Sequence, residues 1–108
     1  MAIFHWKLQR ISALLLIPIV FYVTIYLFNI GGLSYADVAG DVSSIQGMLL
    51  IGFMALVLFT HSSLGIETII EDYIHETKTQ SLLVKLSKFF HVILFLITLI
   101  SLTLIKGN

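Results

Sequence analysis

The 108-residue chain has no cysteine, so on its own it cannot form a disulfide, a thiolate zinc site or a cysteine-ligated iron–sulfur cluster. Charged side chains make up only 11% of the residues, and six basic residues balance six acidic ones. A chain without net charge has no general electrostatic attraction for nucleic acid or acidic substrates. We therefore expect no nucleic-acid partner.

Apolar side chains are in excess, with 58% hydrophobic residues and a mean hydropathy of +1.04. A water-soluble domain of this length could not bury so much apolar surface. Residues 11–30, 47–70 and 82–105 are each long enough to cross a hydrocarbon core of about 30 Å as a helix. The sequence predicts an all-α, integral membrane domain, residues 1–108, with three transmembrane helices. We expect the first span to be retained rather than cleaved.

Lysine and arginine are unevenly distributed around these stretches. Five of the six precede the first stretch or lie in and just after residues 71–81, one follows the third stretch, and none lies in residues 31–46. Because positive charge is retained on the cytoplasmic side, we expect the N-terminus and residues 71–81 on that side, or on the matrix side in a mitochondrion. Residues 31–46 and the C-terminus are then expected outside.

The first connection is rich in turn-forming residues, so we expect a solvated loop with room for one short surface turn. Ser43 is followed three residues later by Gln46. This spacing is typical of a capping box and predicts the start of the second long helix there.

His61 is the most unusual residue for its position. It lies about ten residues, or roughly 15 Å, from the charged end of its span at Glu71, close to the bilayer midplane. A histidine at that depth is costly unless it has a partner, and an intramembrane ionisable residue is a candidate for function. The alternative is that His61 makes an interhelical hydrogen bond and has no further role.

Helical spacing places His61 on one stripe with Gly65, Thr68 and Asp72, each within about 40° of His61 around the helix. Glycine one turn from a histidine removes a side chain where a flat group could lie against the helix. A porphyrin whose iron is bound by His61 has this steric requirement, and imidazole is a good haem ligand.

A second axial imidazole is not expected from this chain. His91 follows Lys88 by only three residues, so we expect it near the membrane interface rather than at the depth of His61. A bis-histidine haem would take its other ligand from another chain.

Three polar residues are expected at the cytoplasmic end of the bundle: Asp72 and Tyr73 at the end of the second span and Arg10 at the start of the first. A phenol can donate a hydrogen bond to a quinone carbonyl, a carboxylate can relay protons, and a guanidinium can pair with a haem propionate. The alternative is that Arg10 snorkels and the acidic residues form an ordinary solvated helix end.

Two segments, HWKLQRISALLLIP (5–18) and HSSLGIETIIEDYIH (61–75), resemble the small hydrophobic anchor subunits of succinate dehydrogenase, respiratory complex II. The resemblance extends over essentially the whole chain, is closest to the bacterial type related to mitochondria, and is most specific in the pattern His-x3-Gly-x6-Asp-Tyr. It implies a bacterial inner-membrane protein forming half of a heterodimeric helix bundle with a larger cytochrome b anchor subunit. A flavoprotein and an iron–sulfur subunit would dock on the cytoplasmic or matrix face.

The same resemblance implies a role for each candidate residue. His61 is expected to be an axial ligand of haem b, shared with the partner anchor, with Gly65 packing against the haem. Tyr73 is expected to hydrogen-bond ubiquinone beside Asp72, which would take part in proton delivery. Arg10 is expected at a haem propionate or in the quinone pocket. The complex would pass electrons from succinate to ubiquinone, linking the tricarboxylic acid cycle to the respiratory chain, with no independent activity in this chain.

Two other functions remain open at this stage. One is the anchor of a fumarate reductase that uses menaquinone. The other is a non-redox scaffold or small transporter subunit in which His61 only packs. The first and third spans offer few polar residues for a transport path, and no nucleophile–base pair or complete metal site indicates an independent enzyme.

Overall fold

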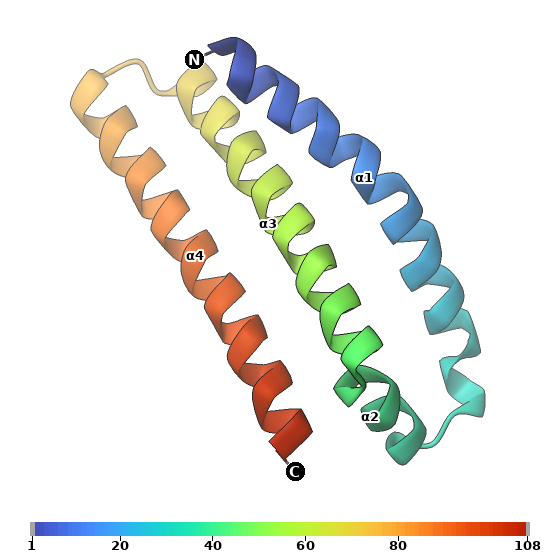
Figure 1. Ribbon diagram of the computed structural model, residues 1–108. Helices are drawn as coiled ribbons and strands as arrows, with labels where there is room; N and C mark the ends of the chain where they lie inside the picture. Colours follow the sequence, from blue (N-terminus) through green and yellow to red (C-terminus); the bar gives the residue numbers. More distant parts are fainter. Residues whose placement is uncertain (1, 108) are drawn as a thin grey trace.

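The computed structural model describes residues 2–107, which are almost entirely helical (Figure 1). The elements, in chain order, are α1 (Ala2–Asn29), the short 3-10 helix η1 (Ile30–Gly32), α2 (Tyr35–Ser43), α3 (Ile45–Tyr73) and α4 (Thr77–Gly107). No strand occurs within this described range. The all-α prediction is confirmed.

Each of the three long helices can cross a membrane. The candidate spans are Ile3–Gly32, Ile45–Tyr73 and Thr77–Gly107, with mean hydropathies of 2.4, 2.0 and 2.2. Most large apolar side chains are exposed on the chain, and the buried apolar residues found in the described range are Ala55, Val57 and Leu102. A bilayer solvates such a surface, while the helices satisfy their own backbone groups. The predicted architecture of three transmembrane helices is therefore confirmed.

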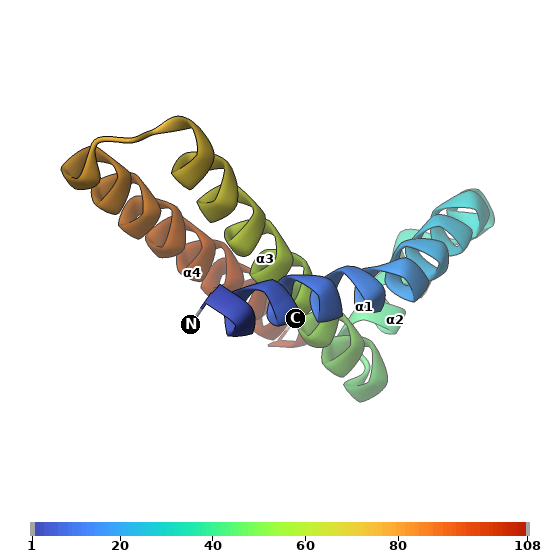
Figure 2. The ribbon, with the colours of Figure 1, turned by 90° about the horizontal axis from the view of Figure 1, so that it is seen from above.

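The helix α3 lies between α1 and α4 (Figure 1). The N-terminal end of α1, the end of α3 and the start of α4 lie at one end of the molecule, and α2 lies at the other (Figure 1). From above, α3 and α4 run side by side, whereas α1 crosses α3 obliquely (Figure 2). Residues of α3 therefore have two different neighbours, α1 and α4.

The first connection is more ordered than predicted, because it contains the helix α2. Ser34 caps this helix: its hydroxyl accepts a hydrogen bond from the Asp37 N–H at 3.1 Å, and the Asp37 carboxylate accepts one from the Ser34 N–H at 2.9 Å. The hydrogen bond from the Ser34 N–H favours the ionised carboxylate and lowers the pKa of Asp37. The Tyr26 hydroxyl donates to Asp41 at 2.8 Å and so ties α1 to α2.

The start of α3 lies one residue beyond the predicted capping box. Ser43 is the last residue of α2, and Ser44 caps α3 by accepting a hydrogen bond from the Gly47 N–H at 2.9 Å. The box predicted from Ser43 and Gln46 is therefore wrong. Gly47 lies so close to α2 that an added Cβ would overlap the carbonyl oxygen of Asp41, so the corner between the two helices requires glycine.

Candidate functional site

His61 lies in the middle of α3 and contacts α1. Its Nδ1 is 3.0 Å from the hydroxyl oxygen of Ser12, which is itself 2.9 Å from the carbonyl oxygen of Gln9. Ser12 is only 4% exposed, and His61 is half-buried. The interhelical hydrogen bond considered as the alternative is thus present. It uses one ring nitrogen only, and among the described residues none forms a hydrogen bond with Nε2.

His91 lies on α4 at nearly the same level of the bundle. Its Nε2 is 3.0 Å from the hydroxyl oxygen of Ser62, the neighbour of His61 in the sequence. The prediction that His91 is far from the depth of His61 is therefore wrong. The helices α3 and α4 are antiparallel and joined by residues 74–76 alone, so residues equally far from this turn come together.

The environment of His91 occupies both of its ring nitrogens. Nδ1 lies 2.7 Å from the carbonyl oxygen of Ser87, while Nε2 has the contact with Ser62. The ring also meets Phe59 edge-on, with the two ring centroids 6.5 Å apart. His91 therefore has the contacts of a packing residue and offers no free ligand nitrogen.

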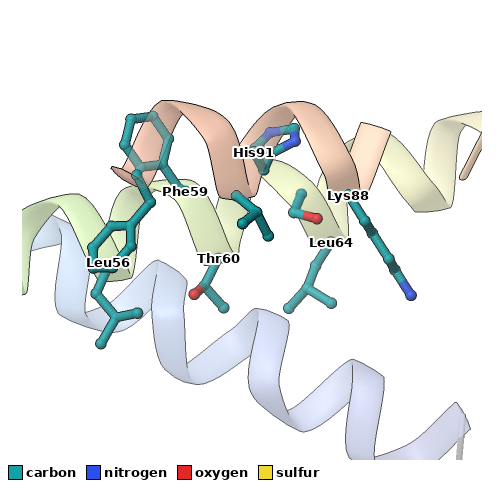
Figure 3. Close-up of a pocket in the computed structure, with 9 residues that line it drawn as sticks. Leu56, Phe59, Thr60, Leu64, Lys88 and His91 are labelled. Atoms are coloured by element: carbon teal, nitrogen blue, oxygen red, sulfur yellow. The ribbon is translucent and has the colours of Figure 1, made fainter. Parts of the chain in front are cut away.

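A cavity of about 350 Å³ opens between α3 and α4 beside His91 (Figure 3). Its walls are mostly apolar and include Leu56, Phe59, Thr60 and Leu64. His61 does not line this cavity, because its side chain contacts α1 instead. The pocket and the candidate ligand histidine thus belong to different sides of α3.

The stripe that begins with His61 continues toward the end of α3. Gly65 faces α1, and an added Cβ there would meet only the side-chain amide of Gln9, at 4.0 Å. The Thr68 hydroxyl donates to the Leu64 carbonyl at 3.0 Å, which is an ordinary intrahelical bond. The surface beside Gly65 is therefore lightly packed, and Thr68 needs no partner outside its helix.

No hydrogen bond or ion pair joins the side chains of the three polar residues predicted for the cytoplasmic end, within the described part of the chain. Asp72 and Tyr73 end α3, both are exposed, and Tyr73 is 78% exposed. Arg10 is exposed on α1, where its guanidinium carbon lies 5.2 Å from the ring centroid of Trp6 in a cation–π contact. These side chains are accessible to molecules outside this chain.

The sequence reasoning missed Glu67, which is the one Asp, Glu, Lys or Arg residue in the predicted span 47–70. Its side chain is 16% exposed and lies between His5 of α1, at 3.4 Å, and Lys88 of α4, at 3.7 Å. A cavity of about 540 Å³ adjoins this group and is also lined by Glu71. A charge within an apolar stretch of this length was the signal that could have identified it.

Comparison with known proteins gives two matches. Residues 1–104 match the family described as succinate dehydrogenase/fumarate reductase transmembrane subunit. The succinate dehydrogenase membrane anchor subunit of Reclinomonas americana is 39% identical over 82 residues, which cover 70% of this chain and 66% of that relative. The chain thus spans just under two thirds of the relative's length. No solved structure matches.

Proposed function

The chain belongs to the family of succinate dehydrogenase and fumarate reductase transmembrane subunits, and from this membership we propose that it anchors a succinate:ubiquinone oxidoreductase. The observation that carries the proposal is the family match over residues 1–104, which includes all three membrane-spanning helices. In this role the chain pairs with a larger cytochrome b anchor subunit. The flavoprotein and iron–sulfur subunits dock where α3 meets α4, on the cytoplasmic side of a bacterial inner membrane or the matrix side of a mitochondrial one.

His61 is proposed as one axial ligand of a haem b shared with the partner anchor. Three observations support this role: the residue is half-buried in the middle of a transmembrane helix, one ring nitrogen is held by Ser12, and Nε2 has no hydrogen bond within residues 2–107. Gly65, one turn further along α3, has no side chain that would block a flat group beside the helix. The residues therefore fit a haem edge, and a haem bound there supplies one-electron transfer.

The second axial ligand is assigned to the partner anchor. His91 has the appropriate side chain, but its two ring nitrogens already contact Ser62 and Ser87. Using it as a ligand would leave a serine hydroxyl without its partner in a poorly solvated place. We therefore assign the second axial ligand to the partner anchor, although His91 lies at nearly the same level of the bundle as His61.

Arg10 is proposed to pair with a haem propionate. It lies two residues before Ser12, or about 3 Å along α1 toward the end where α3 terminates. Its guanidinium group is exposed and stacks on the Trp6 ring, and it forms no ion pair or hydrogen bond with another residue of 2–107. A charged group that stacks on an aromatic side chain keeps its donors available for an anionic oxygen.

Tyr73 and Asp72 are proposed to act at the quinone site. Both are exposed at the end of α3, so the phenol can donate a hydrogen bond to a ubiquinone carbonyl and the carboxylate can exchange protons with water. Reduction of a quinone to a quinol consumes two protons. An accessible carboxylate beside the hydrogen-bond donor can pass such protons from water to the quinone.

A fumarate reductase anchor is the second candidate function, because the description of the matched family names both enzymes. One family description covers the transmembrane subunits of both enzymes, so the match does not fix the direction of the reaction. Measurement of the membrane quinone, together with the rates of succinate oxidation and fumarate reduction by the purified complex, separates them. Ubiquinone and faster succinate oxidation support our proposal, whereas menaquinone and faster fumarate reduction support the second candidate.

The deciding experiment is purification of the complex through a tag on this chain. We expect three other subunits on a gel, two of them large, and a b-type α-band in the dithionite-reduced minus oxidised spectrum. The same subunits without the band would retain the anchor role and remove the haem role of His61. If neither partners nor haem co-purified, the chain would be a non-redox membrane protein.

A further inference from the structure

Ser12 connects two hydrogen-bonding groups inside the contact between α1 and α3. Its hydroxyl oxygen lies 2.9 Å from the carbonyl oxygen of Gln9, three residues earlier in the same helix, and 3.0 Å from Nδ1 of His61. Ser12 is the buried polar residue of the described range, at 4% exposure. Water therefore has little access to the Ser12 hydroxyl. Its hydrogen bonds are made with Gln9 and His61 rather than with solvent.

The single proton of the Ser12 hydroxyl determines which nitrogen of His61 is protonated. A backbone carbonyl can only accept a hydrogen bond, so the short contact with Gln9 requires the hydroxyl proton. The Ser12 oxygen then has only lone pairs to offer His61, and Nδ1 must be the donor. In a neutral imidazole, a proton on Nδ1 leaves Nε2 unprotonated, with its lone pair available for a metal ion.

His91 provides an internal contrast. The carbonyl of Ser87 is 2.7 Å from its Nδ1, so Nδ1 is again the donor. Here the Ser62 hydroxyl lies 3.0 Å from Nε2 and donates to it. Both histidines therefore carry a proton on Nδ1. The Ser62 hydroxyl occupies the Nε2 lone pair of His91, whereas no serine contacts Nε2 of His61 within the described residues.

We propose that Ser12 is a positioning residue that holds His61 in the tautomer required for coordination through Nε2. The inference rests on the proposed haem function and adds to it a residue on α1 that acts through His61 rather than by binding the iron itself. A hydrogen bond from Nδ1 to an acceptor fixes the ring orientation and makes the opposite nitrogen a stronger donor to the metal. A stronger donor favours the ferric state and lowers the haem reduction potential.

The test compares variants of the whole complex purified from membranes. Ser12→Ala removes the acceptor, Ser12→Thr retains a hydroxyl that can also bond to a carbonyl in the preceding turn, and Ser62→Ala removes the matched serine contact of the other histidine. Potentiometric titration and the EPR spectrum of the oxidised haem are recorded for each complex. His61→Leu is included to establish whether this histidine binds the haem.

We expect Ser12→Ala to raise the haem potential and shift the EPR spectrum, Ser12→Thr to restore both, and Ser62→Ala to leave both unchanged. Unchanged signals in Ser12→Ala, in a complex that loses its haem in His61→Leu, would overturn the positioning role alone. Equal shifts in Ser12→Ala and Ser62→Ala would also overturn it, because the effect would then be general packing. Haem that persists in His61→Leu, or is absent from the wild-type complex, would reject the proposed haem function and this inference with it.

Discussion

Nζ of Lys88 lies 3.7 Å from Oε1 of Glu67, so a basic side chain of α4 reaches a carboxylate near the end of α3. The other carboxylate oxygen lies 3.4 Å from Nε2 of His5 on α1, at ion-pair distance but without hydrogen-bond geometry. One carboxylate therefore lies within 4 Å of a histidine on α1 and a lysine on α4. We expect this carboxylate to help hold the three helices together at the end where the soluble subunits are proposed to dock.

The first prediction concerns this carboxylate. Glu67→Ala removes the common partner of His5 and Lys88, and we expect a loss of about 1 kcal/mol in stability, since the Lys88 side chain is 56% exposed and its interaction is screened. The temperature at which the purified complex releases its other subunits measures this loss. Glu71→Ala is the control, because Glu71 lines the same cavity but forms no ion pair within the part of the chain that the structure describes. Equal effects of the two substitutions would contradict the bridging role of Glu67.

The second prediction concerns the corner between α2 and α3. Gly47→Ala places a methyl group against the carbonyl oxygen of Asp41, and overpacking of this kind costs roughly 1–3 kcal/mol. Gly52→Ala is a matched control within the same helix, because its added Cβ meets nothing within 4 Å. Thermal unfolding of the two variants in detergent should show a lower midpoint for Gly47→Ala alone. An unchanged midpoint would mean that α2 shifts easily and is not held by this corner.

The arrangement of the spans follows from the sequence because only an apolar helix of about 20 residues can satisfy its backbone within a bilayer. The helix α2 was missed for a local reason. Its composition of glycine, serine and aspartate predicts turns, yet Ser34 and Asp37 have the spacing of a capping box and stabilise a helix there.

The candidate site was predicted in part, and the missing part depends on packing. Depth along one helix identifies His61 as unusual, because a helix has a fixed rise per residue. The level of His91 depends on how α4 pairs with α3 after a short turn. The helix α4 begins at Thr77, in polar sequence that precedes the predicted span 82–105, so the turn is shorter than the sequence suggested. The contact of Ser12 with His61 depends on where α1 crosses α3, which no pattern within one helix encodes.

The third prediction separates the two histidines. His61→Leu should abolish or strongly perturb the haem spectrum, because the iron loses its proposed ligand. His91→Leu should retain the haem spectrum and lower the stability of the complex, because it removes the contacts with Ser62 and Ser87. Reduced minus oxidised spectra, normalised to the amount of this chain, measure both effects. Haem loss in His91→Leu alone would exchange the assigned roles of the two residues.

The fourth prediction tests the quinone role of Tyr73. Tyr73→Phe removes the phenolic donor while keeping the ring, and loss of a hydrogen bond worth about 1 kcal/mol should slow ubiquinone reduction by roughly fivefold. Succinate oxidation with an artificial soluble acceptor should remain near wild type, because that reaction bypasses the membrane site. Tyr35→Phe is the control, since Tyr35 is also exposed but lies at the other end of the bundle, at the start of α2.

The ratio of the two activities identifies the affected step. A lower ratio of quinone to artificial-acceptor activity in Tyr73→Phe, with an unchanged ratio in Tyr35→Phe, places the lost hydrogen bond at the quinone. If both activities fell together, the substitution would have disturbed assembly with the soluble subunits, and Tyr73 would be a docking residue. Because its side chain is 78% exposed at the end of α3, either contact is sterically accessible to it, and only the activity ratio separates them.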